Sequence, residues 1–423
     1  MTTRTLDQTA YDALSSACAD VREATDTDHV DTVRPGLVAR PTDVQQVAEV
    51  LRAATAHRLS VVPRGRGTKM SWGTPPTSAD VLLDVSALDQ VIDHAAGDLI
   101  VSAQAGTPLA DIQQAVGSAA QRLALDETVP GTSIGGLLAT NTSGPRRVAV
   151  GTARDLLIGI TLVRADGVVA KAGGRVVKNV AGYDLGKLMI GSFGTLAVIV
   201  EATFRLHPRP SARTWVSAPV SDPTEAQRLV QSLLHSQAVP AAIEVEWGTA
   251  AGASTGVVSV LLEGREDGVA GRVATVRALL GETSTDSSSH QPAGGETYPW
   301  DVLAVGDDRS TAFKLTFALS GLSDVMHAAT ETGVTLRGSA GAGVAYAALA
   351  PGTPTDAART ALDRLRHTCT ARGGSAVVVD APTDVKSGLD VWGPVPALDL
   401  MSRVKDQFDP DRRLAPGRFV GGL

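Results

Sequence analysis

The sequence has few cysteines, few aromatic residues and no long hydrophobic run. Its two cysteines, Cys18 and Cys369, lie far apart, and no Cys-x-x-Cys pair or histidine–cysteine cluster with metal-ligand spacing occurs. The sequence therefore argues against a disulfide framework, a metal site and a self-held iron–sulfur cluster, and predicts two buried thiols in a reducing compartment. No apolar run reaches the ~18 residues of a membrane-spanning helix, so we expect no transmembrane segment.

Positive charge is also scarce. The 38 lysines and arginines are outnumbered by 45 aspartates and glutamates, which gives a net charge of −7. Such a chain has no general attraction to nucleic acid or to acidic membranes, so we expect neither as a partner. The first ten residues are polar and lack the apolar core of a signal peptide, which predicts a cytoplasmic protein.

The chain is long and rich in glycine. A chain of 423 residues with 43 glycines and 43% hydrophobic residues indicates a loop-rich protein of two or three domains with a sizeable core. We interpret residues 1–34 as a lead-in, 35–210 as a first domain, 211–395 as a second domain, and 396–423 as a tail that returns to the first.

The first domain alternates helix and strand patterns. Apolar side chains recur at helical spacing from Val44 to Ala54, behind the start signal Pro41-Thr42-Asp43. Over 1–33 we expect a helical lead-in with a charged, acidic tail. We also expect a helix from 107, strands at 37–40, 59–63, 81–84, 156–164 and 196–200, and a hairpin over 91–105.

The second domain repeats one order of elements. This order predicts two βαββαβ-type units in one split sheet with helices on one face, although the first unit lacks a clear final strand. The expected strands are 213–219, 241–247, 256–263, 312–318, 334–338, 343–350 and 374–380; the expected helices are 222–237, 267–280, 321–332, 355–372 and 397–407; residues 281–297 are expected to form a polar loop.

A glycine loop follows the strand predicted at 59–63. The run Arg64-Gly65-Arg66-Gly67-Thr68-Lys69 offers backbone donors, a hydroxyl and cations, a set that suits a pyrophosphate. It is not a nicotinamide fingerprint, because Met70 leaves the G-x-G-x-x-G pattern incomplete, and it is not a Walker loop. Taken alone, such a run is more often an ordinary turn.

Two further runs have the same character. Residues 130–144, PGTSIGGLLATNTSG, contain many glycines and hydroxyls. This composition favours close passage of the backbone along a flat polar ligand, with N–H and O–H groups supplying the contacts; the alternative is a glycine-rich helix start. Residues 175–201 contain the bend Gly191–Thr195 before a buried strand. Its glycines permit positive φ and close approach, and we expect free N–H groups at the mouth of that strand.

Together these runs resemble the flavin-binding domain of the vanillyl-alcohol oxidase family, the p-cresol methylhydroxylase (PCMH) type. The resemblance covers about residues 35–210 and rests on RGRGT, PGTSIGGLLATNTSG, GTARDLLIG, KNVAGYDL and GSFGTLAVI. The Lys178–Leu185 run and the closing Phe408-Asp409-Pro410…Pro416-Gly417 narrow it to the glycolate oxidase group, and most to its smaller flavin-binding subunit.

The resemblance implies an α+β fold with a two-part PCMH-type FAD-binding domain and a ferredoxin-like split βαβ cap domain. It implies noncovalent FAD, with the pyrophosphate on the 64–69 loop, the isoalloxazine and ribityl along 130–144, and the adenine end at 191–199. The cofactor-binding residues so implied are Pro63, Arg64, Gly65, Arg66, Gly67, Thr68, Lys69, Pro130, Gly131, Thr132, Ile134, Gly135, Gly136, Ala139, Thr140, Ser143, Gly144, Gly191, Gly194, Thr195, Val198 and Ile199.

The chain departs from the family at two places. Members that tether FAD often place a histidine after the glycine loop, where this chain has Thr68 and Lys69, so we expect no covalent link. The catalytic large subunit and related D-2-hydroxy-acid dehydrogenases carry a His-x-x-Asp-Gly-Asn-x-His run, which none of the eight histidines here forms. No general base can be named; the polar residues expected nearest the flavin are Lys69, Arg146, Lys178 and Tyr183.

Three functional hypotheses follow. The absent histidines favour an FAD-binding oxidoreductase subunit of a glycolate-oxidase-like complex, oxidising a 2-hydroxy acid (glycolate to glyoxylate) by hydride transfer to flavin. Its partners would be a larger FAD-binding catalytic subunit and an iron–sulfur subunit, in the cytoplasm or peripheral to the inner face of the membrane through those partners. The alternatives are a stand-alone FAD-dependent dehydrogenase or oxidase of another hydroxylated substrate, and a flavin-fold scaffold without its own catalysis.

Overall fold

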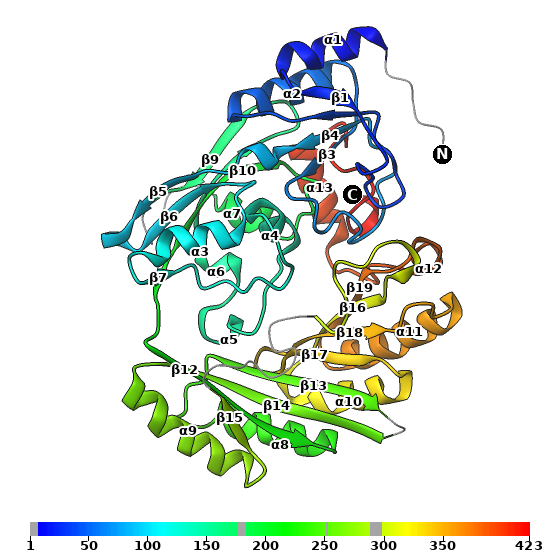
Figure 1. Ribbon diagram of the computed structural model, residues 1–423. Coiled ribbons are helices and arrows are strands. Elements are labelled where there is room, and N and C mark those ends of the chain that lie inside the picture. Colours follow the sequence, from blue (N-terminus) through cyan, green and yellow to red (C-terminus); the bar gives the residue numbers. More distant parts are fainter. Residues whose placement is uncertain (1–6, 176–182, 251–252, 288–297) are drawn as a thin grey trace. The chain divides into compact units, whose positions relative to one another are not determined.

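The computed structural model describes residues 7–175, 183–250, 253–287 and 298–423, and the chain divides into two compact units (Figure 1). The first unit comprises Met1–Thr142, Thr152–Pro208 and Pro394–Leu423; the second comprises Ser143–Gly151 and Arg209–Gly393. The C-terminal tail therefore packs with the N-terminal half of the chain. The assignment of these units to a cofactor domain and a cap domain stays a prediction.

A small mixed sheet opens the first unit. Strands β2, β4 and β3 are parallel in that order, and β1 pairs antiparallel with β2. Every residue of β4 is buried, as expected for a parallel strand covered on both faces, and α1 and α2 pack their apolar stripes into the same core. The predicted helical lead-in is wrong after residue 17, where a strand follows. The elements are α1 (Gln8–Ala17), β1 (Val21–Glu23), β2 (Leu37–Ala39), α2 (Val44–Ala56), β3 (Val61–Arg64) and β4 (Val81–Asp84).

The second sheet of this unit is antiparallel throughout, in the order β5-β6-β10-β8-β9. The hairpin predicted over 91–105 is confirmed; its two strands turn through a short 3-10 segment that ends at Leu99 with φ 57°. The elements are β5 (Val91–Ala95), β6 (Ile100–Gln104), β8 (Leu157–Val163), β9 (Val169–Gly173) and β10 (Val198–Arg205).

Short helices and a two-stranded ribbon surround this sheet. The helix predicted from residue 107 is present as α3, with Leu109, Ile112 and Val116 buried as expected. The 130–144 run contains a true helix, α4, which begins after the N-cap Ser133 and ends at Asn141 in the left-handed conformation. The elements are α3 (Leu109–Gly117), β7 (Gln121–Arg122), α4 (Ile134–Thr140), α6 (Ala153–Leu156), α7 (Leu185–Met189) and β11 (His207–Pro208).

The C-terminal tail is fastened to the first unit by one fully buried lysine. Lys405, on helix α13 (Leu398–Phe408), donates hydrogen bonds to Asp409 Oδ2 at 2.7 Å, to the carbonyl of Thr195 at 2.6 Å and to the carbonyl of Leu414 at 3.0 Å. Leu414 also forms a parallel bridge with Val61 of β3. The tail is thereby joined both to the 191–195 bend and to the strand that leads into the glycine loop.

The second unit is one eight-stranded antiparallel sheet in the order β15-β12-β14-β13-β17-β18-β16-β19. Each half has the same internal order, so the predicted pair of βαββαβ units is confirmed, and β13 and β17 join the halves edge to edge. The missing final strand of the first half is the three-residue β15, inside the predicted loop; residues 288–297 lie outside the described residues. The elements are α5 (Arg147–Val150), β12 (Ala212–Val220), α8 (Pro223–Leu234), β13 (Ala242–Ala250), β14 (Ala253–Gly264), α9 (Glu266–Leu280), β15 (Thr285–Ser287), β16 (Thr311–Thr316), α10 (Leu322–Thr332), β17 (Thr335–Ser339), β18 (Val344–Leu349), α11 (Thr355–Ala371), β19 (Ser375–Asp380) and α12 (Thr383–Ser387).

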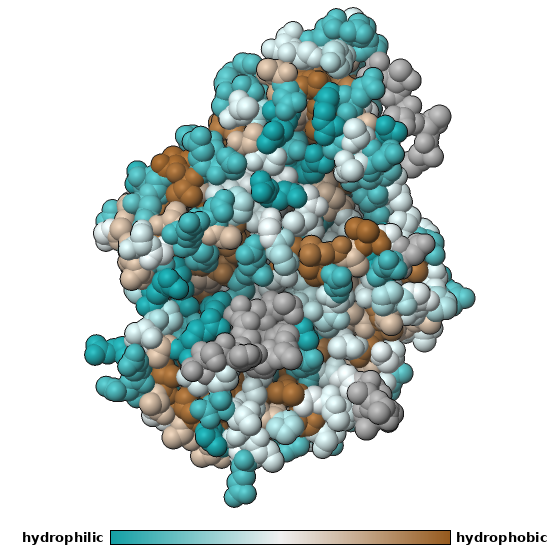
Figure 2. Space-filling model, viewed as in Figure 1, coloured by the Kyte–Doolittle hydropathy of each residue, from teal (hydrophilic) through white to brown (hydrophobic). Residues whose placement is uncertain are grey.

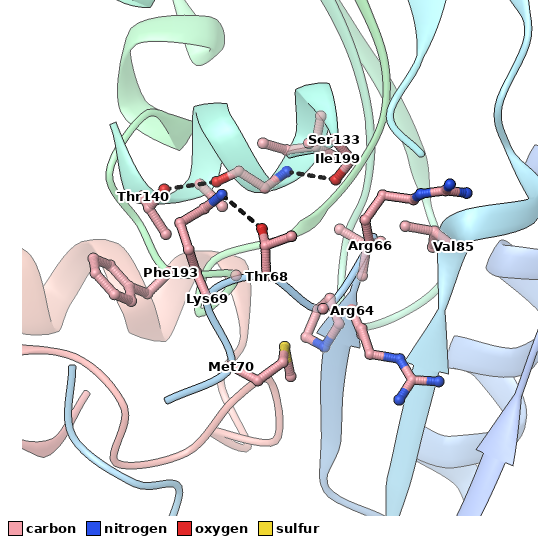
Figure 3. Close-up of a pocket in the computed structure, with 18 of the residues that line it drawn as sticks. Arg64, Arg66, Thr68, Lys69, Met70, Val85, Ser133, Thr140, Phe193 and Ile199 are labelled. Atoms are coloured by element: carbon pink, nitrogen blue, oxygen red, sulfur yellow. Dashed lines mark hydrogen bonds between the residues drawn. The ribbon is translucent and has the colours of Figure 1, made fainter. Parts of the chain in front are cut away.

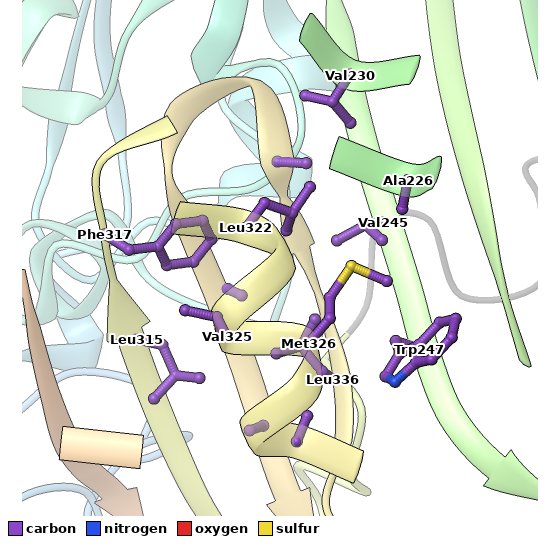
Figure 4. Packing of buried hydrophobic residues seen from close by; sticks show 14 of the residues in the cluster. Ala226, Val230, Val245, Trp247, Leu315, Phe317, Leu322, Val325, Met326 and Leu336 are labelled. Atoms are coloured by element: carbon purple, nitrogen blue, oxygen red, sulfur yellow. The ribbon is translucent and has the colours of Figure 1, made fainter. Parts of the chain in front are cut away.

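Helices α8 to α11 cover one face of this sheet, where alternate strand residues form the core. Figure 4 shows Leu322, Val325 and Met326 of α10 packed between side chains of β13 and β16. The indole of Trp247 is buried there, and its Nε1 donates to Thr330 Oγ1 at 2.9 Å. This hydrogen bond satisfies the polar atom of the buried indole.

On the face drawn in Figure 2, hydrophilic and neutral residues predominate, and hydrophobic residues form separate small groups. Among the described residues, no helix has the length and apolarity needed to cross a membrane.

Candidate functional site

The first unit contains a pocket built from three separated runs of the chain, 63–70, 133–140 and 193–199 (Figure 3). Its empty space, counted together with the part open to solvent, is about 710 Å³. The structure thus brings together the three glycine-bearing runs singled out in the sequence. The predicted cofactor-binding residues that line it are Pro63, Arg64, Gly65, Arg66, Gly67, Thr68, Lys69, Gly135, Gly136, Ala139, Thr140, Gly194, Val198 and Ile199.

The glycine loop supplies free backbone donors. Strand β3 ends at Arg64, and the N–H groups of residues 65–69 donate no hydrogen bond to any described residue. Gly67 has φ 77°, which lets the loop turn back, and a Cβ on Gly65 would collide with the Ser133 side chain. Consecutive free N–H groups in such a turn form a concave site for an anion.

The two arginines of this loop differ in whether a carboxylate neutralises their charge. Arg64 is neutralised: its guanidinium lies 3.0 Å from Asp28 and 2.7 Å from Asp84. The hydrogen bond from Arg22, with a smaller one from Arg64, holds the pKa of the Asp28 carboxyl well below its usual value, so that carboxyl stays charged. Arg66 is exposed and has no ion pair with a described residue. Arg66, and not Arg64, is therefore the loop cation available to a ligand.

Lys69 is buried against helix α4. Its Nζ donates hydrogen bonds to Thr68 Oγ1 at 3.1 Å and to Thr132 Oγ1, and Figure 3 shows it extending from the loop toward the helix. Burial lowers the pKa of Lys69 to about 7, and Glu127 acts in the opposite direction. The amine can therefore be neutral or charged near physiological pH.

The 130–144 run lines the pocket with small residues, and two of its N–H groups bond within the protein. The N–H groups of Ile134 and Gly135 donate to the carbonyls of Thr107 and Ala105, at 3.0 and 2.7 Å. Gly135 is required by this contact, because a Cβ there would lie 2.9 Å from the Cβ of Ala105. The expectation that backbone N–H groups of this run serve a ligand is thus wrong for these residues; Gly136, Ala139 and Thr140 line the pocket instead.

The 191–195 bend also differs from its prediction. Gly191 and Gly194 take positive φ as expected, but the N–H groups of Gly191 and Phe193 donate to the carbonyls of Leu138 and Ala139. The bend therefore caps the C-terminus of α4, where unpaired carbonyls need donors. The expected row of free N–H groups at the mouth of β10 is absent at these two residues.

Several predicted residues lie away from the pocket wall. Ser143 and Gly144 belong to the segment that packs with the second unit, as does Arg146, whose Nε donates to Glu263 at 3.2 Å. Tyr183 is 93% exposed. Lys178 lies outside the described residues. The other predicted residues not on the wall are Pro130, Gly131, Thr132, Ile134, Gly191 and Thr195.

The pocket also contains residues that sequence reasoning missed. Arg418 is the most distant of them in sequence: it reaches the pocket from the tail and donates to the carbonyls of Met70 and Trp72, at 3.0 and 2.8 Å. Its place directly after Pro416-Gly417 is the sequence signal that could have identified it. The full set of missed lining residues is Met70, Val85, Ser133, Phe193, Ala197 and Arg418.

Comparison with known proteins agrees with this geometry. Residues 35–173 match the FAD binding domain family. The chain is 31% identical over 211 residues to the glycolate oxidase subunit GlcD of Bacillus subtilis, covering 50% of this chain and 45% of that protein. It is 35% identical over 170 residues to the glycolate oxidase subunit GlcE of Escherichia coli, covering 40% and 48%. In both cases the match spans less than half the length of the relative.

A longer match and a solved structure extend the comparison. An uncharacterised FAD-linked oxidoreductase of Mycobacterium tuberculosis is 27% identical over 92% of this chain and 91% of its own length. A chitooligosaccharide oxidase superposes with a TM-score of 0.69 over 96% of this chain and 98% of that one, at 16% identity, which shows the fold.

These findings show an FAD-binding domain over residues 35–173, and the chain is similar over most of its length to an FAD-linked oxidoreductase. Part of the chain resembles two glycolate oxidase subunits, and 49% of it is 30% identical to a D-lactate dehydrogenase of Archaeoglobus fulgidus. FAD is therefore its cofactor.

Proposed function

We propose that FAD binds in the pocket of the first unit, with its diphosphate on the 65–69 loop. The observation that carries this proposal is the row of five consecutive N–H groups, 65–69, that no described residue accepts from. Two negative charges on a diphosphate match this row and the unpaired Arg66. A neutral ligand would leave the same donors without a strong acceptor.

The remaining wall fits the rest of the cofactor. Gly135, Gly136, Ala139 and Thr140 form a surface of small side chains along one side of α4, suited to a flat ring system. The residue after the glycine loop is Thr68 and not histidine, so we propose noncovalent binding. No cluster of histidine, cysteine, aspartate and glutamate suited to a metal ion exists among the described residues, and the proposal needs none.

For the reaction, we propose oxidation of a 2-hydroxy acid such as glycolate. Bound FAD supplies the hydride acceptor, and the protein positions it. The reaction also needs an acceptor for the hydroxyl proton and a cation for the substrate carboxylate. Neutral Lys69 is one candidate acceptor, since the residues that line the described pocket include no histidine, aspartate or glutamate.

The shortage of proton acceptors on this wall supports a role inside a complex. We propose that the chain is the FAD-binding subunit of a glycolate-oxidase-like assembly with a larger FAD-binding catalytic subunit and an iron–sulfur subunit. The similarity to both GlcD and GlcE supports this assignment. We place that assembly in the cytoplasm, or at the inner face of the membrane through its partners.

The principal alternative is a stand-alone FAD-dependent dehydrogenase or oxidase of another hydroxylated substrate. The specific observation in its favour is the match over 92% of this chain to an FAD-linked oxidoreductase, 91% of whose own length is covered. A flavin-fold scaffold without catalysis is the third hypothesis.

Two measurements on the purified full chain separate these functions. A flavin absorption spectrum, native or after reconstitution with FAD, is expected for both catalytic roles, and its absence would favour the scaffold. Anaerobic mixing with glycolate or D-lactate then distinguishes the two: we expect no bleaching of the flavin by the lone chain and bleaching once the partner subunits are added. Bleaching of the lone chain would favour the stand-alone enzyme.

A further inference from the structure

Buried cations in this chain fall into two kinds. The described residues contain four buried lysine or arginine side chains: Lys69, Lys386, Lys405 and Arg418. Lys405 pairs with Asp409 at 2.7 Å, and Lys386 lies 3.5 Å from Asp380. Lys69 and Arg418 have no ion pair with any described carboxylate, and both line the same pocket. Because an uncompensated buried charge is strongly unfavourable, this coincidence calls for a counter-charge from a ligand.

Of these two residues, Arg418 has the greater need for a counter-charge, because it stays protonated. Lys69 can release its proton near neutral pH, but an arginine cannot: burial lowers the pKa of Arg418 only to about 10, with Asp31 acting in the opposite direction. Arg418 is 4% exposed, and its Nε has no hydrogen-bond partner among the described residues. The carbonyls of Met70 and Trp72 orient the guanidinium through Nη2 but leave its charge in place.

Backbone hydrogen bonds fix the tail, and with it Arg418, beside the glycine loop. Val61 of β3 donates to the carbonyl of Arg413, and Ala415 donates to the carbonyl of Val61, at 2.9 and 2.8 Å, so the tail runs beside the strand that enters the loop. Thr77 then donates to the carbonyl of Pro416 at 2.8 Å. A side chain carried on a backbone fixed at three points is preorganised, which increases the binding energy that its charge can contribute.

We propose that Arg418 is the fixed positive charge that binds a negatively charged group of the cofactor in this pocket. The proposal rests on the binding of FAD proposed above. Two groups of FAD qualify: the diphosphate, and the flavin ring system, which takes up negative charge on reduction. A guanidinium in a water-poor pocket stabilises either group through charge-assisted hydrogen bonds.

The test uses the full chain with three substitutions. Arg418→Gln removes the charge and keeps a hydrogen-bond donor, Arg418→Lys keeps the charge, and Arg403→Gln removes an exposed, unpaired charge from helix α13 of the same tail. For each we would measure the dissociation constants of FAD and of riboflavin, which lacks the diphosphate, and the reduction potential of bound FAD. Thermal melting of each variant verifies folding.

At neutral pH we expect only Arg418→Gln to differ from wild type. If Arg418 binds the diphosphate, FAD affinity falls at least tenfold while riboflavin affinity is unchanged. If it binds the ring system, the ratio of affinities for reduced and oxidised FAD falls at least tenfold, a potential about 30 mV more negative. The proposal would be overturned if Arg418→Gln folds and both its FAD affinity and its ratio of affinities for reduced and oxidised FAD stay within twofold of wild type.

A second comparison covers the case in which Arg418→Gln does not fold. Arg418→Lys replaces a charge that persists to high pH with one that titrates, so FAD affinity of this variant should fall more steeply at high pH than that of wild type. Identical pH profiles would overturn the proposal. A wild-type chain that binds no FAD at all would instead contradict the proposed function, so the two failures are distinguishable.

Discussion

Replacing Lys405 with methionine should loosen the tail and destabilise the first unit. The lysine and Asp409 are each 1% exposed at the side chain, and the ammonium also serves the carbonyls of Thr195 and Leu414. Removing one partner of a buried ion pair leaves the other charge uncompensated, which costs about 3–5 kcal/mol. In Lys405→Met, Asp409 keeps the hydrogen bond from the Leu414 N–H but loses its cation.

The size of the effect can be read from thermal melting. For a unit of this size, each kcal/mol lowers the melting temperature by ~2–4 °C, so we expect a fall of roughly 6–20 °C. Calorimetry on the full chain would follow the transition that added FAD raises, since a ligand of the folded first unit stabilises that unit. Lys187→Met is the matched control, because the Lys187–Asp184 pair has the same chemistry on an exposed surface and is worth ~1 kcal/mol or less.

The outcome that refutes this reasoning is specific. If Lys405→Met and Lys187→Met lower the melting temperature equally, the buried pair does not fasten the tail. The same result would remove the argument that the tail holds Arg418 rigidly in place.

Three further predictions follow from individual contacts. The pKa of Lys69 is lowered from 10.5 to about 7, so between these values the unfolded chain binds more protons; the unfolding free energy of FAD-free wild type should rise with pH there, by at most ~1.4 kcal/mol per unit, and Lys69→Met should lose that rise in denaturant titrations. Gly135→Val should crowd Ala105, cost ~1–3 kcal/mol and purify with little flavin; full occupancy in absorption spectra would show the contact to be unimportant. Cys18 and Cys369 are buried, and burial raises the pKa of Cys369 to about 12, so both thiols should react with a thiol reagent only after denaturation.

The sequence predicted helices and strands correctly where hydrophobic periodicity and capping or turn residues indicate the same element. The N-cap before α2, the alternating strands of the second unit and the repeated order of its two halves all carry local signals, and each is present. The lead-in after residue 17 was mispredicted because Val21–Glu23 is too short for a strand pattern and gains its conformation from pairing with β2. Strand β15 was missed for the same reason.

The pocket could be predicted only in part, because composition does not reveal which way a donor points. Glycines identified the three runs correctly, yet the N–H groups of Gly135 and Gly191 are used inside the protein, while those of residues 65–69 are free. That distinction depends on what packs behind each turn. Arg418 lies 348 positions from its partner Met70, and no local pattern reports a contact over that separation.

The most direct measurement of the central claim is a crystal structure of the full chain with FAD. The account predicts diphosphate oxygens ~2.7–3.2 Å from the backbone nitrogens of residues 65–69, with the flavin ring beside Ala139 and Thr140. A structure in which those N–H groups face only water while FAD binds elsewhere on the chain would contradict it.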